Sequence, residues 1–414
     1  MSNVLIVGAG PVGLFTALRL GQRGIKVDVF EKSTQPDQSP RASGYYGPIL
    51  TLLKESGLWD AASTEGYEEN GLLFRSPPVD NGNGGKTFGK QHGYIQDKQL
   101  MLPQSKLAAI IKKAAVGTGN VTIHYHAEAT AIEEAGNSVT LNVKNLGSGE
   151  MEKFKGVYLV GSDGGRSTIR SLLKIPFPGH TWPERIITTN VTRVSDEMPH
   201  VAPHFIIDPV NWAVVIPLSP PKLGQPSQWR YAIAVDSKDP RTDEELLAPE
   251  NIDSVYEKVM VGKRPLEYEV NQKTVYHIHQ RLASTMKRGR CLLVGDAAHL
   301  NCPLGAMGLS TGLLDAEALA DSLTMVLNEG YPELVLDVYA DVRREVFGYF
   351  VDPMTTQNKT RLQGNPVDVE REDGFMRMLR NPAIDPPTLF QKMYKERWVT
   401  DMRSKVATMG IKAE

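Results

Sequence analysis

The stretch that decides the fold of this chain is Arg290-Cys-Leu-Leu-Val-Gly-Asp-Ala-Ala-His-Leu-Asn-Cys-Pro-Leu-Gly-Ala-Met-Gly-Leu-Ser-Thr-Gly-Leu-Leu-Asp315. Its apolar run Cys291 to Val294 predicts a buried strand, which breaks at Gly295-Asp296 and leads through a proline and glycine loop to a helical pattern from Leu309. Open α/β sheets bind ligands at the carboxyl ends of their strands, so we expect Asp296 at a ligand site. The loop glycines let a flat ring approach closely, and the dipole of the following helix favours an anionic cofactor.

The N-terminus carries a compact strand, turn and helix pattern. Val4 to Val7 predicts a strand, Leu14 to Gln22 a helix, and Lys26 to Phe30 a second strand that Glu31 follows. In the turn Gly8-Ala-Gly-Pro-Val-Gly13 the three glycines allow, in order, a tight turn, close approach to a pyrophosphate and close helix packing. Glu31 is placed to bind ribose hydroxyls. This context favours adenine-dinucleotide binding over a purely structural glycine turn.

A second strand end repeats the features of the opening stretch. In Tyr158-Leu-Val-Gly-Ser-Asp-Gly-Gly-Arg-Ser-Thr-Ile-Arg170, Asp163 and two glycines follow an apolar run, and Arg166 and Arg170 lie one helical turn apart. Asp163 either shares a ligand with Asp296 or caps the following helix.

Two further polar residues have two interpretations each. Arg41, in a segment rich in proline, serine and glycine, either bridges phosphates or is a solvated surface charge. Gln104 either contacts the cofactor or caps the amphipathic helix that starts there.

The chain changes character after Pro176. Strand-like runs there alternate with proline-rich turns, and a helical pattern follows at Leu246 to Met260; the runs are Arg185 to Thr192, His204 to Ile207, Trp212 to Ile216 and Arg230 to Val235. This pattern predicts an inserted β-rich domain that binds the substrate. After Tyr331 the sequence is mostly helical.

Composition narrows the class of protein. The chain has 414 residues, of which 41% are hydrophobic and 23% charged, so a large core is expected. Its net charge of −2 gives no broad basic surface, which disfavours nucleic acid and membranes as partners. The two cysteines, Cys291 and Cys302, disfavour a disulfide framework or a metal site, and we expect them to be small buried hydrophobes. A secretory leader and a membrane-length apolar run are not recognisable, which favours a cytoplasmic protein.

Three ordered motifs resemble those of a known family. Gly8-Ala-Gly-Pro-Val-Gly-Leu14, Gly161-Ser-Asp-Gly-Gly-Arg-Ser-Thr-Ile-Arg170 and the late Gly295-to-Asp315 region resemble the flavin motifs of single-component FAD-dependent monooxygenases, the aromatic hydroxylase class of phenol hydroxylase and p-hydroxybenzoate hydroxylase. The resemblance covers about residues 1–175 and 285–345. It implies an α/β fold with a Rossmann-like FAD-binding domain (1–175 and 285–330), an inserted β-rich substrate-binding domain (176–284) and a helical C-terminal segment (331–414).

The resemblance also implies the cofactors and their ligands. FAD would be held along its length by Gly8, Gly10, Pro11, Val12, Gly13, Glu31, Lys32 and Arg41 at the ADP end, by Gln104, Asp163 and Asp296 nearer the pyrophosphate and ribityl chain, and by Pro303, Gly305, Ala306, Met307, Gly308 and Leu309 along the isoalloxazine. NAD(P)H would reduce the flavin without a second Rossmann domain. O2 would then give a C4a-hydroperoxide beside Pro303, whose distal oxygen passes to an aromatic or other electron-rich small molecule.

The late motif departs from the family pattern at two positions. Ala306 and Ser310 stand where the family usually has glycine and asparagine. A slightly altered flavin pocket is therefore expected. The extra thioredoxin-like domain of larger phenol hydroxylases is not recognisable, so the oligomeric state stays open.

Candidates for the substrate pocket are mainly aromatic. They are Tyr46, Phe205, Trp212, Tyr231 and Pro303, with Tyr45, His204 and Asn211 as weaker ones, although each aromatic side chain could equally be core. Trp212 is expected near the flavin edge. His299 is expected to brace its loop, and the sequence identifies no catalytic acid or base.

Three alternatives to monooxygenation are compatible with the same FAD domain. A halogenase should carry two tryptophans separated by one residue before an Ile-Pro pair, whereas Trp212 stands alone before Ile216-Pro217. A flavin-dependent reductase or dehydrogenase would turn over without incorporating oxygen, and a non-enzymatic flavin protein would not oxidise NAD(P)H.

Overall fold

A six-stranded sheet, with strands from residues 3–161 and 287–293, forms the framework of one half of the molecule. The computed structural model describes residues 3–34, 42–194 and 203–413, and the sheet runs in the order β19 (Lys287–Arg288), β20 (Cys291–Leu293), β12 (Tyr158–Gly161), β1 (Asn3–Val7), β2 (Lys26–Glu31) and β8 (Val121–Tyr125). Its strands pair in parallel except at β19, with Leu5 beside Leu159 and Asp28. The carboxyl ends of β1, β2, β12 and β20 therefore meet at one edge.

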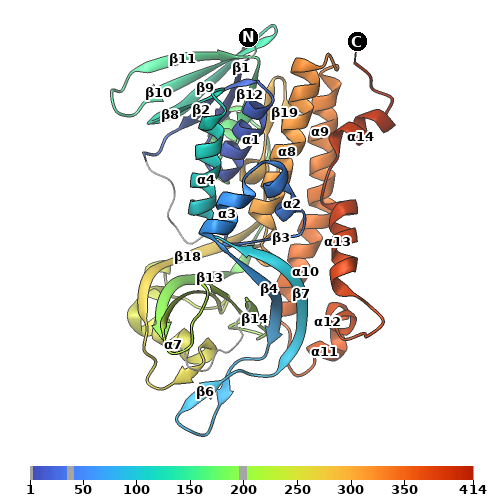
Figure 1. Cartoon of the computed structure of the whole chain (residues 1–414). Coiled ribbons are helices and arrows are strands. Elements are labelled where there is room, and N and C mark those ends of the chain that lie inside the picture. The colour runs from blue at the N-terminus through green and yellow to red at the C-terminus, as the bar shows by residue number, and fades with distance from the viewer. Residues whose placement is uncertain (1–2, 35–41, 195–202, 414) are drawn as a thin grey trace.

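Helices cover this sheet because their apolar faces need burial. The main ones are α1 (Pro11–Gln22), α4 (Gln104–Gly117), α8 (Met307–Asn328) and α9 (Leu334–Val346), and α1 packs against both α4 and α8. Pro11 suits the first turn of α1, and Phe15 and Leu18 of that helix are buried. A three-stranded antiparallel sheet lies beside the framework (Figure 1), formed by β9 (Ala127–Ala135), β10 (Ser138–Asn145) and β11 (Met151–Gly156).

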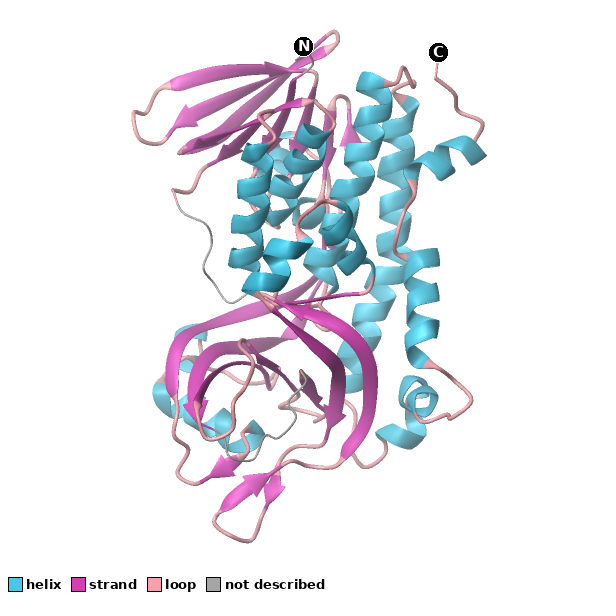
Figure 2. Cartoon of the chain, in the orientation of Figure 1, coloured by secondary structure: helices cyan, strands magenta, loops and turns pink. Residues whose placement is uncertain are grey.

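A strongly curved sheet of nine strands forms the other half (Figure 2). Its order is β21 (His299–Leu300), β18 (Glu269–Leu282), β13 (Gly179–Val194), β16 (Pro226–Val235), β15 (Ala213–Pro217), β14 (His204–Ile206), β4 (Tyr67–Arg75), β7 (Gln91–Met101) and β3 (Gly44–Tyr46). The amphipathic α7 (Pro249–Val259) buries Ile252, Val255 and Tyr256 against it. The smaller elements of this half are α6 (Asp243–Leu246), β5 (Val79–Asp80), β6 (Gly85–Thr87) and β17 (Gly262–Lys263).

The C-terminal helices run along one side of both halves (Figure 1). A π-helical segment, Phe347–Val351, joins α9 to the elements α10 (Asp352–Leu362), α11 (Val369–Glu372), α12 (Gly374–Leu379), α13 (Pro386–Arg397) and α14 (Met402–Thr408). The remaining short helices are α2 (Pro48–Glu55), α3 (Trp59–Glu65) and α5 (Thr168–Leu172). The C-terminal segment therefore packs along both halves of the molecule instead of forming a separate tail.

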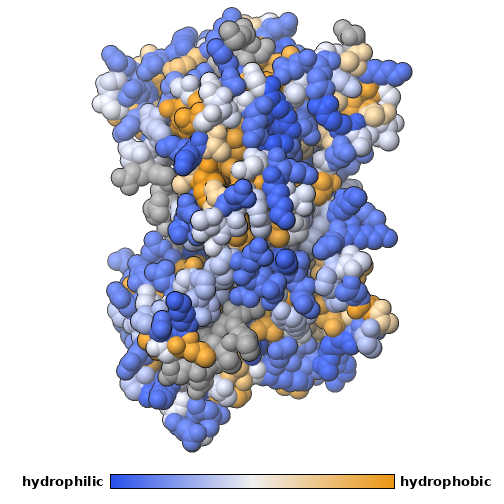
Figure 3. All heavy atoms as spheres, in the orientation of Figure 1, coloured by the Kyte–Doolittle hydropathy of each residue, from blue (hydrophilic) through white to orange (hydrophobic). Residues whose placement is uncertain are grey.

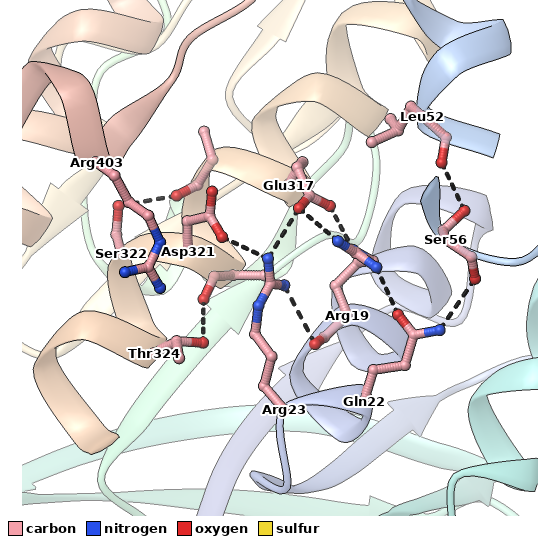
Figure 4. A network of polar contacts seen from close by, with 12 residues as sticks. Arg19, Gln22, Arg23, Leu52, Ser56, Glu317, Asp321, Ser322, Thr324 and Arg403 are labelled. Carbon is pink, nitrogen blue, oxygen red and sulfur yellow. Dashed lines mark hydrogen bonds and ion pairs between the residues drawn. The ribbon is translucent and has the colours of Figure 1, made fainter. Parts of the chain in front are cut away.

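Charged side chains tie α1 to α8 (Figure 4). Arg19 Nε lies 2.6 Å from Glu317, and Arg23 contacts Glu317 at 2.9 Å and also Asp321. Arg403 of α14 pairs with Glu329 at 2.7 Å just after α8. Because α1 and α8 each start at the edge where the strands end, this network fixes two helix N-termini relative to each other.

The sequence predictions differ from this fold in two places. The strand-like pattern of residues 154–160 predicts one continuous strand, and this prediction is wrong, because the chain leaves β11 at Gly156 and enters a different sheet at Tyr158. The nine-stranded sheet takes β3, β4 and β7 from before residue 176, although the limits of the two domains stay a prediction.

The face of the molecule drawn in Figure 3 carries mostly hydrophilic residues, with hydrophobic ones gathered mainly in its upper half. Within residues 3–34, 42–194 and 203–413, no helix has the length and apolar character needed to cross a membrane.

Candidate functional site

A cavity of about 850 Å³ lies where the strands of the six-stranded sheet end. Gly8, Glu31, Asp163 and Asp296, which follow or end four of these strands, all line it. Its far wall comes from the nine-stranded sheet and from the C-terminal helices. The volume falls within the range of small-molecule and cofactor sites.

The turn between β1 and α1 presents bare backbone to the cavity. A Cβ at Gly8 would lie 2.6 Å from the Ser162 carbonyl oxygen, whereas a Cβ at Gly10 would meet nothing within 4 Å. Gly8 is therefore required by packing, and Gly10 leaves open the space in front of the α1 N-terminus, where a phosphate group is favoured. A Cβ at Gly13 would lie 2.1 Å from the Gly8 carbonyl oxygen, so Gly13 allows packing and does not itself line the cavity.

The acidic end of β2 is held in place from two sides. The Glu31 carboxylate accepts hydrogen bonds from the backbone N–H groups of Ala9 and Ser33, both at 2.8 Å. Lys32 follows it on the cavity wall. A carboxylate has room for further donors, so Glu31 can still accept from ribose hydroxyls. Arg41, the remaining residue expected at this end, lies outside the described residues.

Asp163 both caps a helix and lines the cavity. Its carboxylate accepts from Thr168 N at 2.7 Å, from Ile169 N at 3.1 Å and from the Ser167 hydroxyl. The capping interpretation is thus correct for α5, and the cavity position is compatible with a ligand role as well. Gln104 begins α4 and also lines the cavity, with its backbone N–H donating to Ala42 at 2.9 Å.

The late loop lines the cavity along its whole length from Pro303 to Leu309. Ala306 has φ 51°, in the left-handed region that glycine adopts without strain, and it stands at the N-cap of α8. The Tyr46 hydroxyl donates to the Gly305 carbonyl. Asp296 lies in a single 3-10 turn, Gly295–Ala297, directly after β20. The helix dipole of α8 is thus aimed at the cavity from behind this loop.

A buried charged cluster supports the loop from below. The Asp315 carboxylate accepts from His299 Nε2 at 2.6 Å, from Arg343 Nε at 2.7 Å and from Gly295 N at 3.2 Å. Burial alone would raise the pKa of Asp315, but the charge of Arg343 and the hydrogen bond from His299 hold it below the ordinary value. His299 also stacks on Phe347 at 4.6 Å. The expectation that His299 braces the loop therefore agrees with its contacts.

Sequence reasoning missed the partners in this cluster. Asp315 ends the opening stretch without an assigned role, and Arg343 belongs to a sequence that predicts only a helix. Arg343 is fully buried and donates to the Trp398 carbonyl at 2.8 Å and to the Thr400 hydroxyl at 3.0 Å. The signal was an arginine at an apolar helix position, which implies a buried partner.

Both cysteines are free and buried, as expected. Burial raises the pKa of the Cys291 thiol, and it raises that of Cys302, beside Pro303, to about 12. Cys302 also donates its backbone N–H to the Gln280 side chain at 2.8 Å.

The wall opposite the glycine turn is mainly apolar. It is built by Leu72, Phe74, Ile95, Ile186, Phe205, Val214, Ile216, Ala232 and Ile278. Polar side chains of the same sheet also line the cavity, namely Asp97, Gln99, Arg230, Thr274, Tyr276, His277 and His279. Arg230 is 7% exposed and donates to Asn190 at 2.9 Å and to Ser43 at 3.4 Å, and burial lowers its pKa. Burial also raises the pKa of Asp97.

Two expected pocket residues lie elsewhere. Tyr231 packs in the core beneath α7, and Trp212 is fully buried in a cluster with Phe74 and Leu304. Alternate residues of a strand face opposite sides, so Arg230 and Ala232 of β16 line the cavity while Tyr231 between them does not. Trp212 and Tyr231 therefore do not line the cavity, whereas Tyr46, Phe205 and Pro303 do. The weaker candidates Tyr45, His204 and Asn211 are absent from its lining.

The residues present fit a dinucleotide joined to a flat ring. The open backbone at Gly10 and the α1 N-terminus suit a pyrophosphate, Glu31 suits a ribose, and the loop before α8 suits a ring that carries negative charge. The apolar wall leaves space for a second, mainly hydrophobic molecule in the same cavity.

Comparison with known proteins agrees with this geometry. Residues 1–352 match the family model described as FAD binding domain. The chain is 32% identical over 385 residues to para-nitrophenol 4-monooxygenase of Pseudomonas sp. (strain WBC-3), covering 91% of each chain. It is also 32% identical over 361 residues to 6-hydroxy-3-succinoylpyridine 3-monooxygenase HspB of Pseudomonas putida (strain DSM 28022 / S16), covering 87% of this chain and 88% of that one.

Solved structures show the same fold. The crystal structure of p-nitrophenol 4-monooxygenase PnpA from Pseudomonas putida DLL-E4 superposes with a TM-score of 0.78 at 29% identity, covering 99% of this chain and 98% of that one. Aklavinone-11 hydroxylase, solved with FAD and aklavinone, gives a TM-score of 0.75 at 21% identity, covering 94% of this chain and 77% of that one.

Proposed function

Because this chain belongs to the FAD-dependent aromatic monooxygenases, we propose that its 850 Å³ cavity is one active site, with FAD at the glycine-turn end and an aromatic substrate against the apolar wall. The enzyme class uses NAD(P)H as electron donor and inserts one atom of O2 into its substrate. The observation that supports this arrangement best is that a single cavity is lined by both the cofactor-type residues and the apolar strands.

We assign the cofactor contacts to the residues that line that end. Gly10, Pro11 and Val12 would face the pyrophosphate, Glu31 the ribose, and Pro303 to Leu309 the ring, with Lys32, Gln104, Asp163 and Asp296 between them. Bound FAD, reduced by NAD(P)H, supplies the chemistry that activates O2. The chain's part is to hold the ring against an apolar, water-poor space and to orient the substrate carbon toward it.

The substrate we propose is a small phenol. Both curated relatives are named for substrates with a hydroxylated aromatic ring, a nitrophenol and a hydroxypyridine. The apolar wall suits the ring face, and Arg230 is a buried cation on the same wall. Its guanidinium would stabilise a negatively charged oxygen on the substrate, which raises electron density in the ring.

The test is isotopic. The purified protein should carry FAD, oxidise NADH or NADPH faster when 4-nitrophenol is added, and place one labelled atom from isotopically labelled O2 in the product. A product without label would show a dehydrogenase or reductase and refute the proposal. Loss of FAD during gentle purification under saturating FAD would refute it as well.

The assignment of Asp296 is tested separately by Asp296→Ala. Loss of a charged hydrogen-bond acceptor to a ligand costs about 1.5 to 3 kcal/mol, so FAD affinity should fall by roughly 10- to 100-fold. Asp60→Ala, which removes an exposed carboxylate of α3 outside the cavity lining, is the control and should leave FAD affinity near the wild-type value. Equal FAD affinity of the Asp296 variant and the wild type, measured by flavin fluorescence titration, would contradict the role.

A further inference from the structure

A second cavity of about 920 Å³ lies among the C-terminal helices. Met354 of α10, Phe375 of α12, and Phe390 and Met393 of α13 line both this cavity and the active-site cavity. These four side chains, the partition, are therefore what separates the two spaces. The outer rim of the second cavity is polar and exposed, at Asn365, Glu372, Lys392, Glu396 and Arg397.

The partition is made only of aromatic and thioether side chains. Phe375 and Phe390 stack at 5.9 Å, and Phe390 stacks in turn on Tyr394 at 6.2 Å. Tyr394 lies 5.8 Å from Tyr46, whose hydroxyl holds the Gly305 carbonyl. A row of rings thus leads from the second cavity to the loop expected to face the flavin. Methionine and stacked rings change rotamer without breaking backbone hydrogen bonds, so such a partition can open.

By contrast, charged contacts hold the helices around the partition in place. Arg361 of α10 pairs with Asp373 at 3.0 Å, and its guanidinium lies 4.1 Å above the Phe375 ring. Arg361 also donates to Asn358 at 2.7 Å. These contacts hold α10 and α12 together at one edge, so movement is concentrated in the side chains at the centre.

We propose that the second cavity is an entry vestibule for the aromatic substrate, and that Met354, Phe375, Phe390 and Met393 select substrates by width as they pass inward. This inference rests on the proposed function, because FAD bound at the glycine turn would block the opposite end of the active-site cavity. The vestibule favours a flat, weakly polar ring, which can stack on Phe375 and Phe390 in transit.

The test measures entry and not turnover. Stopped-flow flavin absorbance of the oxidised holoenzyme gives association rates for 4-nitrophenol and for the wider 2-phenylphenol. Phe390→Ala should raise the rate for the wider phenol by about tenfold, and Phe390→Trp should lower both rates by about fivefold. Gln391→Trp, on the exposed face of the same helix and outside both linings, is the matched control.

Phe390→Trp retains an aromatic ring and is therefore expected to keep the fold, and circular dichroism checks that both variants are folded. Association rates that stay within about twofold of wild type in both Phe390 variants would overturn the vestibule, even if phenol is hydroxylated normally. Width-dependent changes in the rates without any labelled product would instead support the vestibule and overturn the proposed reaction.

Discussion

Replacing Asp315 by asparagine removes the negative charge from the buried cluster that Asp315 forms with His299 and Arg343, and it keeps the shape of the side chain. Asp315 and Arg343 are both 0% exposed and 2.7 Å apart. Removing one partner of a buried ion pair leaves the other charge uncompensated and typically costs about 3 to 5 kcal/mol. The asparagine amide would also place donors against Arg343 or His299. We therefore expect Asp315→Asn to lose about 4 kcal/mol, a large part of a typical free energy of unfolding.

The same substitution changes the response to acid. The folded-state pKa of Asp315 is depressed, so its stabilisation is present above the unfolded value near 3.8 and is lost as pH falls through the folded pKa. The variant should lack this part of the acid destabilisation. It should also bind FAD more weakly, because the Gly295 N–H beside Asp296 loses its acceptor.

Urea denaturation of the holoenzyme, followed by tryptophan fluorescence, measures the loss. Asp321→Asn, on the same helix with a side chain 20% exposed, is the matched control and should cost less than about 1 kcal/mol. A decrease in the free energy of unfolding for Asp315→Asn within about 1 kcal/mol of that control would refute the reasoning that the buried ion pair contributes strongly to stability.

Two other substitutions test local features. Ala306→Gly removes an alanine with a left-handed backbone conformation and should stabilise the protein by about 1 kcal/mol in the same assay. The control Ala407→Gly, at an exposed helical position, should destabilise the protein by a similar amount, and a destabilising effect of both substitutions would contradict the strain at Ala306. Burial and the nearby Lys90 and Arg380 lower the pKa of His92, so its contribution to stability is present above pH 6.5 and is lost as pH falls below that value. His92→Gln should therefore flatten the fall in melting temperature between about pH 6.5 and 5, and the exposed His126→Asn should not.

The cofactor end of the site was predictable because its signals are local. The turn from Gly8 to Gly13, Glu31 after β2 and the loop from Pro303 to Leu309 each combine a short-range glycine requirement with a strand end. In a parallel sheet all such ends meet at one edge, so the sequence pattern places them together without knowledge of other contacts.

The substrate end was not predictable in the same way. Whether a residue of β16 faces the cavity or the core depends on register, and a shift by one residue exchanges Arg230 for Tyr231. The sequence offers no marker of that register. The contribution of Phe390 and Tyr394 depends on where a helix almost 400 residues along the chain packs, which is a long-range contact with no local signal.

The position of Cys302 has a consequence for the lifetime of the enzyme. In the proposed active site the Cys302 thiol directly precedes Pro303, which lines the cavity, and thiolates are the form of cysteine that peroxides attack. Burial raises the pKa of this thiol to about 12, so its thiolate is much scarcer at neutral pH than that of an ordinary cysteine. The packing that buries Cys302 therefore disfavours the form of the thiol that peroxides oxidise.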